Sequence, residues 1–549
     1  MPSSERGKRK MNNTWPKAAL GLLLSTSLVL AGCSSDKGAA GESAKPTTAA
    51  VPSDMNESGL PIAKEKLTLN IAAFKPPSGK DLNDYKIFKD IEASTNVHIN
   101  WNLTPGSSWN EKKNLLFAGG ELPDAFYAHG ILNEDTDIVK YGSQGILIPL
   151  EGLIEKYAPN VKKMFQNNPT YKKQLTAPDG HIYSLPTIDE SYSQTKSTMF
   201  INKKWLDQLK LPIPTTTDEL YTTLKAFKDN DLGGNNKKDQ IPLSFLQNWN
   251  SDVNSLFGAF GRIDRDVHKV GNNHLSVEND KVVYTAAQPE YKAAIQYFNK
   301  LFAEGLADPE SFTQDSKVLT AKESKGIIGV VFDWNPANQD YVSLPPLKGP
   351  NGKDPVWAAY ANGILLRGSF AITNVNKHPE ATMRWIDNMY DPKISMQFSR
   401  GVIGGSSLKE RSDGKYDAIA TPSGASADDF MQVPPTAYSV WGLTKAVTDL
   451  VVPPAASGNR SKIDIDNVYG KYLVDNAFPK TYFTAEESDQ ISRYLTDIDA
   501  YVSKMYAKWM LSGGIDKEWD DYVKKLKDMG LDNMMKIYQQ VYDRYKASK

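Results

Sequence analysis

The sequence predicts an α/β fold, and three observations support this prediction. Apolar residues alternate with polar or small residues in several short stretches, which is the period of a half-buried strand. Segments with helical spacing of apolar residues, each followed by a helix-stop signal, lie between these stretches. The chain has 549 residues, of which 40% are hydrophobic and 10% aromatic, so it can bury more than one core. Strands that alternate with helices are typical of sheets covered by helices.

The first part of the chain shows this alternation most clearly. Strands are predicted over Leu67 to Phe74, Val97 to Leu103 and Pro123 to Tyr127, with helices over Asp81 to Ser94 and Trp109 to Gly119 between them. Open sheets of this kind bind ligands beyond the carboxyl ends of their strands.

The rest of the chain continues the pattern. Gly180 to Pro186 should lead out of the first sheet, because proline cannot continue a central strand. A capping box at Thr216 to Glu219 should open a helix that runs to Lys228. A second box at Thr484 to Glu487 opens a helix with a core-facing apolar stripe. The other predicted elements are strands over Met199 to Ile201, Gly326 to Phe332, Gly363 to Leu366 and Phe370 to Ile372, and helices over Lys203 to Leu209 and Pro379 to Tyr390.

Charge and cysteine content exclude several classes of protein. Lysine and arginine total 64 against 65 acidic residues, for a formal net charge of -1. No overall positive field is therefore available to hold nucleic acid. The chain has one cysteine, Cys33, so it forms no intramolecular disulfide.

The N-terminus has the pattern of a secretion signal. Four basic residues between positions 8 and 17 precede an apolar run of about 14 residues, shorter than the roughly 20 of a membrane span. The run ends in Leu-Ala-Gly before Cys33, which resembles the lipobox of bacterial lipoproteins. We therefore expect residues 1–32 to be a signal peptide, Cys33 to carry a lipid such as palmitate, and residues 33–65 to be a flexible tether.

One stretch resembles a known family. Phe200 to Leu220, with Asn-Lys-Lys-Trp-Leu-Asp near its start and Pro-Thr-Thr-Thr-Asp-Glu-Leu at its end, resembles the signature of extracellular solute-binding proteins, family 1, which serve ABC importers. Gly119 to Asp124, Asn376 to Tyr390 and Ile515 to Tyr545 resemble the LplA-like lipoprotein branch, which includes alginate-oligosaccharide binders. The resemblance covers most of residues 66–549.

The resemblance implies a two-lobed, periplasmic-binding-protein-like α/β fold with a ligand cleft between the lobes and a helical C-terminus. Lobe one would comprise residues 66–185 and 355–450, and lobe two residues 186–354 and 451–549. Such proteins close on their ligand about a hinge.

A polar loop in the expected second lobe is a candidate calcium site. Residues 231–240 match, without gaps, the D-x-N-x-N-x-K-x-D-E calcium loop of the alginate-binding relatives, although Gly233 and Gln240 depart from it. A calcium ion needs six to eight oxygen ligands. The same residues also suit a metal-free turn held by Asx hydrogen bonds. By the resemblance, the candidate ligands are Asp231, Asn235, the Lys237 carbonyl, Asp239 and Gln240.

Other catalytic and metal motifs do not occur in the sequence. The six histidines show no zinc-type spacing, and neither a G-x-S-x-G elbow nor a G-x-x-x-x-G-K-[ST] phosphate loop is found. Paired carboxylates for glycoside cleavage depend on tertiary structure and stay open.

Sugar recognition is the better-supported chemistry. A sugar ring has an apolar face that stacks on aromatic rings and a rim of hydroxyls that polar side chains bind. Trp334, between Asp333 and an asparagine after a predicted strand, is the strongest candidate, and Lys75 would meet an acidic sugar. The full set of candidate ligand-binding residues is Lys75, Trp109, Tyr127, His129, Trp249, Asp333, Trp334 and Trp441.

The expected function is therefore that of a monomeric lipoprotein on the outer face of the cell membrane. It would capture an oligosaccharide and deliver it to the permease of an ABC importer, without acting as an enzyme. Two alternatives stay open: a secreted polysaccharide-cleaving enzyme, and a lipoprotein of the same fold that binds a peptide or lipid fragment.

Overall fold

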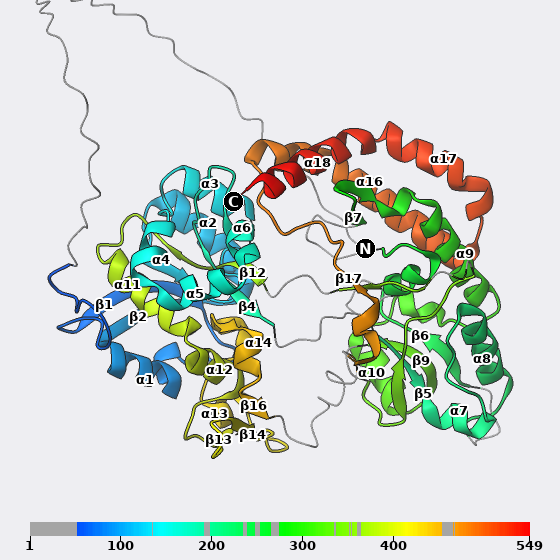
Figure 1. Cartoon of the computed structure of the whole chain (residues 1–549), viewed down its shortest axis with the longest axis horizontal. Coiled ribbons are helices and arrows are strands. Elements are labelled where there is room, and N and C mark those ends of the chain that lie inside the picture. The colour runs from blue at the N-terminus through cyan, green and yellow to red at the C-terminus, as the bar shows by residue number, and fades with distance from the viewer. Residues whose placement is uncertain are drawn as a thin grey trace, which may run out of the picture. The chain divides into compact units, whose positions relative to one another are not determined.

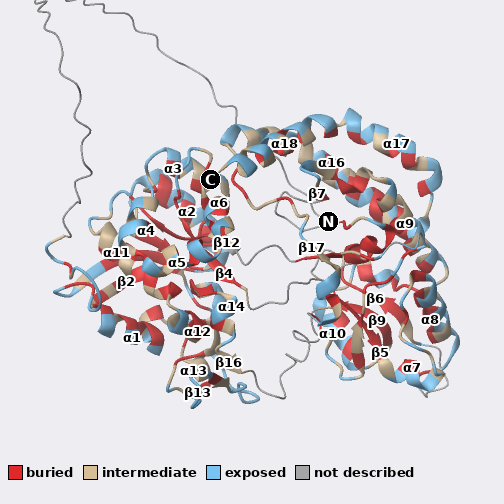
Figure 2. Ribbon diagram, viewed as in Figure 1, coloured by how far each residue is buried: buried red, intermediate tan, exposed pale blue. Residues whose placement is uncertain are grey.

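The structure, a computed structural model, describes residues 52–133, 135–190, 198–233, 239–247, 253–264, 274–333, 336–350, 352, 354–359, 364–452, 465 and 467–548. Within these ranges, the two larger sheets have six and four strands (Figure 1). Each sheet belongs to one α/β lobe, and the strands of both are largely buried (Figure 2).

The six-stranded sheet of the first lobe has the order β15-β4-β12-β3-β1-β2. Strand β1 is parallel to β2 on one side and to β3 on the other, whereas β12 is antiparallel to both β3 and β4. The alternation read from the sequence places Leu69 and Ile71 in the core and leaves Asn70 exposed. The strands are β1 Leu67–Phe74, β2 Val97–Thr104, β3 Ala125–Tyr127, β4 Leu185–Asp189, β12 Ile364–Ile372 and β15 Gly442–Leu443.

Helices pack on both faces of this sheet, around two clusters of buried apolar residues. They are α1 Lys86–Thr95, α2 Trp109–Gly119, α3 Asp135–Ser143, α4 Glu151–Tyr157, α5 Pro159–Asn167, α6 Pro169–Leu175, α11 Pro379–Asp387, α12 Pro392–Arg400, α13 Ala427–Met431 and α14 Lys445–Thr448. A three-stranded sheet adds β13 Leu408–Glu410, β14 Tyr416–Ala418 and β16 Val451–Val452.

The four-stranded sheet of the second lobe has the order β10-β5-β9-β6, with β6 parallel to β9 and β5 antiparallel to both of its neighbours. Its strands are β5 Thr198–Asn202, β6 Ile241–Ser244, β9 Ile328–Asp333 and β10 Tyr341–Leu344. Two short pairings involve β7 Leu275–Glu278 with β8 Lys281–Tyr284, and β11 Trp357–Ala358 with β17 Leu473–Val474. The helices are α7 Lys203–Leu209, α8 Thr217–Asp229, α9 Pro289–Ala303 and α10 Ser316–Ser324.

Three C-terminal helices share the apolar core of the second lobe. They are α16 Ala485–Ser512, α17 Ile515–Asp528 and α18 Leu531–Ala547. Helix α16 begins with the predicted capping box, in which Thr484 Oγ1 accepts from Glu487 N and Glu487 Oε2 accepts from Thr484 N. Its predicted stripe is core: Ile498, Val502 and Trp509 are all buried.

Short 3-10 helices connect many of these elements. They are η1 Leu82–Asp84, η2 Gly106–Ser108, η3 Asn254–Phe260, η4 Thr285–Ala287, η5 Pro309–Phe312, η6 Asn388–Tyr390, η7 Thr436–Tyr438 and η8 Gly470–Tyr472.

The structure corrects two strand predictions. The two strands expected around positions 363–372 are one strand, β12, whose register against β4 shifts between Leu366 and Phe370. Gly368 lies inside it because a Cβ there would overlap the Leu132 carbonyl oxygen. Pro186 does not end its strand but lies within β4. It is tolerated because β15 pairs with β4 only from Ile188 onward, so no ladder bond is lost at the proline.

Three local expectations are also corrected. The helix expected over Asp81 to Ser94 is interrupted, since η1 precedes α1. The Glu219 carboxylate of the first capping box binds Thr215 N at 2.7 Å instead of Thr216 N. Residues 52–65 are not the end of a flexible tether, because Met55 and Ile62 are buried in the first lobe's core.

One residue of the C-terminal segment packs in the first lobe. Tyr482 is buried among the apolar side chains around α2 and β3. The Arg367 guanidinium lies 4.2 Å from the centre of its ring, and Arg367 also pairs with Asp135 on α3. The segment between β17 and α16 is therefore anchored to the first lobe by an aromatic side chain.

Candidate functional site

The carboxyl ends of the parallel strands define one edge of the first lobe's sheet. Lys75 follows β1, His129 follows β3, and Trp441 precedes β15, which pairs with the last residues of β4. We call these three residues the first-lobe edge. Lys75 is exposed there, and its backbone N–H donates to Thr104 O at 2.8 Å.

His129 and Trp441 form a stacked pair at this edge. Their ring centroids are 5.6 Å apart and their planes differ by 11°. Burial lowers the pKa of His129 to about 4, so the imidazole is neutral at physiological pH. Within the described ranges, neither His129 Nδ1 nor Trp441 Nε1 has a hydrogen-bond partner, although both atoms are buried. A hydroxyl group both donates and accepts, so it is a suitable partner for these ring nitrogens.

Two other predicted residues, Trp109 and Tyr127, are buried and pack close to the first-lobe edge. Trp109 is buried, its Nε1–H donates to Ile131 O at 2.7 Å, and its ring packs edge-on against Phe74 at 5.7 Å. Tyr127 is fully buried, and its hydroxyl accepts from Val440 N at 3.1 Å, next to Trp441. These contacts favour packing roles, and a ligand contact by Trp109 or Tyr127 stays a prediction.

The corresponding edge of the second lobe lies at the ends of β6 and β9. These strands are parallel, and Ser244 is paired with Val331 near the end of β9. Asp333 is the last residue of β9, and its carbonyl accepts from Thr198 Oγ1 at 2.8 Å. We call Ser244 and Asp333 the second-lobe edge. Trp249 and Trp334, the nearest predicted aromatics in sequence, lie outside the described residues.

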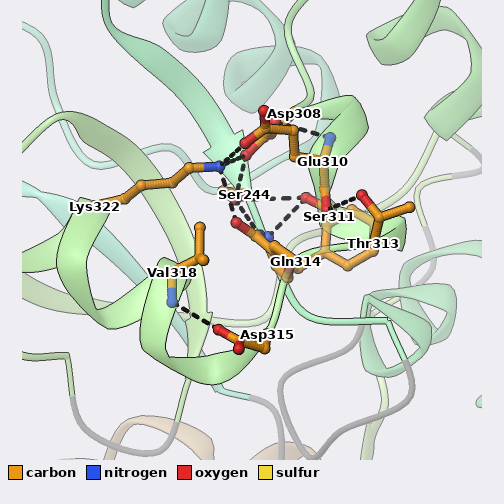
Figure 3. Close-up of polar contacts among 10 residues, drawn as sticks. Ser244, Asp308, Glu310, Ser311, Thr313, Gln314, Asp315, Val318 and Lys322 are labelled. Atoms are coloured by element: carbon orange, nitrogen blue, oxygen red, sulfur yellow. Dashed lines mark hydrogen bonds and ion pairs between the residues drawn. The ribbon is translucent and has the colours of Figure 1, made fainter.

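A buried polar network fixes the end of β6 (Figure 3). Lys322 Nζ on α10 donates to Asp308 Oδ2 at 2.7 Å and to Gln314 Oε1 at 2.9 Å. Ser244 Oγ donates to the same Asp308 oxygen at 2.9 Å. Desolvation lowers the pKa of Lys322, but its hydrogen bonds to Asp308 and to Glu310 outweigh it and raise the pKa overall. Lys322 is therefore charged, and it neutralises Asp308.

The network extends to the backbone that follows β6. Ser311 Oγ accepts from Phe245 N at 3.1 Å, and Gln314 Nε2 donates to Phe245 O at 2.8 Å. Ser311 O accepts from Gln247 N at 2.9 Å. Residues 244–247, which lead towards Trp249, are thus held by side-chain and backbone groups of η5 and the loop after it. Asp308, Gln314 and Lys322 are not predictable as site residues from the sequence, because nothing in their spacing shows that they meet.

The described part of the calcium-loop candidate contains Asp231, Gly233, Asp239 and Gln240, whereas Asn235 and Lys237 lie outside it. The Gln240 amide is oriented so that both its oxygen and its nitrogen have suitable neighbours. In this orientation the side-chain oxygen accepts from Leu232 N, and from Gly233 N at 3.1 Å. This oxygen therefore closes the loop through the backbone. No group of three His, Cys, Asp or Glu residues that would hold a metal occurs among the described residues.

Cys33 also lies outside the described residues. In the part of the chain that is described, every helix is too short or too polar to cross a membrane.

Comparison with known proteins identifies the family. A sequence model described as bacterial extracellular solute-binding protein matches residues 76–396. The chain belongs to this family. FusA of Streptococcus pneumoniae, a fructooligosaccharide ABC transporter substrate-binding protein, is 35% identical over 557 residues, which cover 98% of this chain and 99% of FusA. YtcQ of Bacillus subtilis, a polygalacturonan/rhamnogalacturonan-binding protein, is 24% identical over 554 residues, 98% of this chain and 100% of YtcQ.

Solved structures agree with the sequence comparison. FusA in complex with kestose has a TM-score of 0.73 at 34% identity and covers 88% of this chain and 100% of its own. An EF-hand mutant of FusA with fructo-nystose has a TM-score of 0.72 at the same coverage and identity. A solute-binding protein associated with an HMO-binding ABC transporter, from Bifidobacterium longum infantis, reaches 0.76 at 26% identity and covers 87% of this chain and 99% of its own.

These findings confirm the predicted family and the two-lobed fold. This solute-binding protein is an extracytoplasmic substrate-binding protein of an ABC importer, and its substrate is an oligosaccharide.

Proposed function

We propose that this solute-binding protein carries a neutral fructooligosaccharide. The observation that supports this most is the stacked His129–Trp441 pair, because two buried, uncharged ring nitrogens are suited to a sugar hydroxyl and have no other partner among the described residues. The full-length similarity to FusA adds the sugar class, since FusA is named for fructooligosaccharides.

The charges at the two edges favour a neutral sugar over a pectic one such as YtcQ is named for. Asp333 is the only carboxylate among the predicted ligand residues, and it would repel a uronate. The buried carboxyl of Glu323 lies against it. Lys75 is the only fully charged cation of the predicted set, and it is on the other lobe.

The proposed ligand contacts follow from these placements. His129 and Trp441 would bind hydroxyls from the first lobe, with Lys75 beside them. Asp333 would bind hydroxyls from the second lobe, and Trp249 and Trp334 would stack on sugar rings. Trp109 and Tyr127 would hold the first-lobe edge in place, and a contact of either with the ligand stays a prediction.

We also propose a structural calcium ion in the loop of residues 231–240. Asp231, Asn235, the Lys237 carbonyl and Asp239 would hold it, and Gln240 would hold the loop backbone instead of the ion. Hard oxygen donors suit calcium, and the ion would supply a fixed positive charge that orders the loop. The EF-hand mutant of FusA supports the presence of such a site in a similar protein.

Anchoring and transport complete the proposal. Cys33 would carry the lipid that holds the protein at the membrane, and the monomer would deliver its ligand intact to the permease subunits. Its role would be binding, with no bond made or broken.

A matched pair of tryptophan variants tests the ligand-facing edge. Trp441→Phe removes an N–H that has no partner among the described residues, so it should weaken kestose binding about 5- to 15-fold, equivalent to one hydrogen bond of about 1 to 1.5 kcal/mol, with little loss of stability. Trp109→Phe removes an N–H that donates to Ile131 O, so it should lower stability by about 1 to 2 kcal/mol and leave affinity unchanged. Calorimetric titration and urea unfolding measure both quantities. An unchanged affinity in Trp441→Phe would remove this residue from the site.

A further inference from the structure

Glu323 has a buried carboxyl group next to Asp333 of the second-lobe edge. It lies near the end of α10 and is 1% exposed. Its Oε2 accepts from Ala337 N, 3.1 Å away, in the turn between β9 and β10. Within the described ranges, its Oε1 is reached by no N–H or O–H donor. A buried ionised carboxylate with one unsatisfied oxygen is costly.

Among the described residues, the side chains around Glu323 do not compensate its charge. Asp333, at the end of β9, faces it within hydrogen-bonding reach and adds a second negative charge. Tyr341 on β10 donates its hydroxyl to Ile328 O at 2.7 Å. Lys322, the neighbour of Glu323 on α10, is turned to Asp308, Glu310 and Gln314.

Burial and the Asp333 charge together raise the pKa of Glu323 to about 8. At pH 7 the pair therefore keeps one proton between the two carboxyls. The Ala337 N–H opposes this shift but does not cancel it.

We propose that the Glu323 carboxyl is a positioning residue of the oligosaccharide site, because it joins Asp333 at the end of β9 to Ala337 in the following turn. It fixes the direction in which Asp333 presents its remaining oxygen to a sugar hydroxyl. This inference rests on the proposed function, since it takes Asp333 as a ligand contact.

Ligand binding then becomes linked to one proton. When the pair loses its proton, two carboxylates face each other and Asp333 turns away from its ligand-binding position. The affinity for kestose should therefore fall as the pH rises past 8. Near that pH, binding should take up protons, because the bound state favours the protonated pair.

The variant Glu323→Gln separates this role from mere packing. Its amide oxygen can accept from Ala337 N and its amide N–H can donate to Asp333, but it never ionises. The wild-type protein should lose about 3- to 10-fold in kestose affinity between pH 7 and pH 9.5, whereas Glu323→Gln should keep the neutral-pH affinity within about twofold and show a flat profile. Glu410→Gln, on the exposed strand β13, is the matched control and should follow the wild type.

A measurement without ligand tests the pair on its own. A carboxyl whose pKa is raised on folding contributes stability at low pH and loses it as the pH rises through the folded value. The melting temperature of Glu323→Gln should therefore rise relative to the wild type between pH 5 and pH 9.

The outcomes are distinguishable. If wild type, Glu323→Gln and Glu410→Gln bind kestose with one common pH profile, or if folded Glu323→Gln loses affinity at pH 7, the positioning role is wrong. If none of the three proteins binds kestose at any pH, the proposed sugar and this inference both fail. In that case the melting series still shows whether the carboxyl pair holds a proton.

Discussion

Replacing Lys322 by methionine tests the polar network that fixes the end of β6. Methionine keeps most of the aliphatic volume of lysine but removes the charge. Asp308, 7% exposed, would lose its ion pair at 2.7 Å, and Gln314 Oε1 would lose its donor at 2.9 Å. The contact with Glu310 adds little, because the Glu310 side chain is 65% exposed.

The expected loss of stability depends on the hydrogen bonds that Asp308 retains in the variant. Removing one partner of a buried ion pair costs about 3 to 5 kcal/mol. Asp308 retains Ser244 Oγ at 2.9 Å and Glu310 N at 3.0 Å. The cost of Lys322→Met should therefore lie at about 2 to 3 kcal/mol at pH 7.

Urea unfolding followed by circular dichroism measures this cost. Lys317→Met is the matched control, since Lys317 is exposed on the same helix and its loss should stay within about 0.5 kcal/mol. Kestose affinity should fall in Lys322→Met only, because residues 244–247 lose part of their support. A free energy of unfolding for Lys322→Met within 0.5 kcal/mol of the control would refute the reasoning.

Two further predictions concern stability. Asp387 accepts hydrogen bonds from Asn160 N and Val161 N, yet burial raises its pKa to about 6. The pKa of Asp387 is higher in the folded than in the unfolded protein. Its contribution to the free energy of unfolding is therefore present at pH 4 and lost as the pH rises to 6.5. The stability of the wild type relative to Asp387→Asn should therefore drop by about 1 to 3 kcal/mol across that range in urea unfolding; a constant difference would contradict the shift. Calcium at 1,000 times its dissociation constant should stabilise the native protein by about 4 kcal/mol, seen as a higher melting temperature that EDTA reverses. Magnesium is the control, and an effect of calcium that survives Asp231→Asn together with Asp239→Asn would place the ion elsewhere.

The sequence predicted those elements whose signals are local. The alternation of Leu67 to Phe74 located β1 to the residue, and Gly119-Gly120 marked the end of α2. The capping box at Thr484 correctly started α16. In each case a short period or a cap determines the backbone without help from distant residues.

Features that depend on distant residues were not predictable in this way. The sequence predicts that Pro186 ends its strand. The structure shows why β4 tolerates it, because β15 pairs only with Ile188 and Asp189 of β4. Residues 52–65 read as a tether, because three buried apolar side chains, Met55, Ile62 and Ala63, are a weak signal in a polar stretch.

The candidate site shows the same division. His129, past the third predicted strand, and Trp441 were predicted separately as ligand-binding residues, but their stacking depends on sheet order. Lys322, Asp308 and Glu323 have no sequence signal at all, because an exposed and a buried polar side chain look alike in a sequence. Their roles follow from burial and from partners on other elements.

The central claim, that this protein binds a fructooligosaccharide and returns it unaltered, is tested most directly by calorimetric titration. Purified protein is titrated with kestose and, separately, with an oligogalacturonate and a neutral non-fructose oligosaccharide. The mass of the recovered sugar is then measured by mass spectrometry. The account predicts saturable binding of kestose at a ratio of one to one, no comparable binding of the other two sugars, and kestose of unchanged mass. Tight binding of the oligogalacturonate alone, or a shortened kestose, would contradict it.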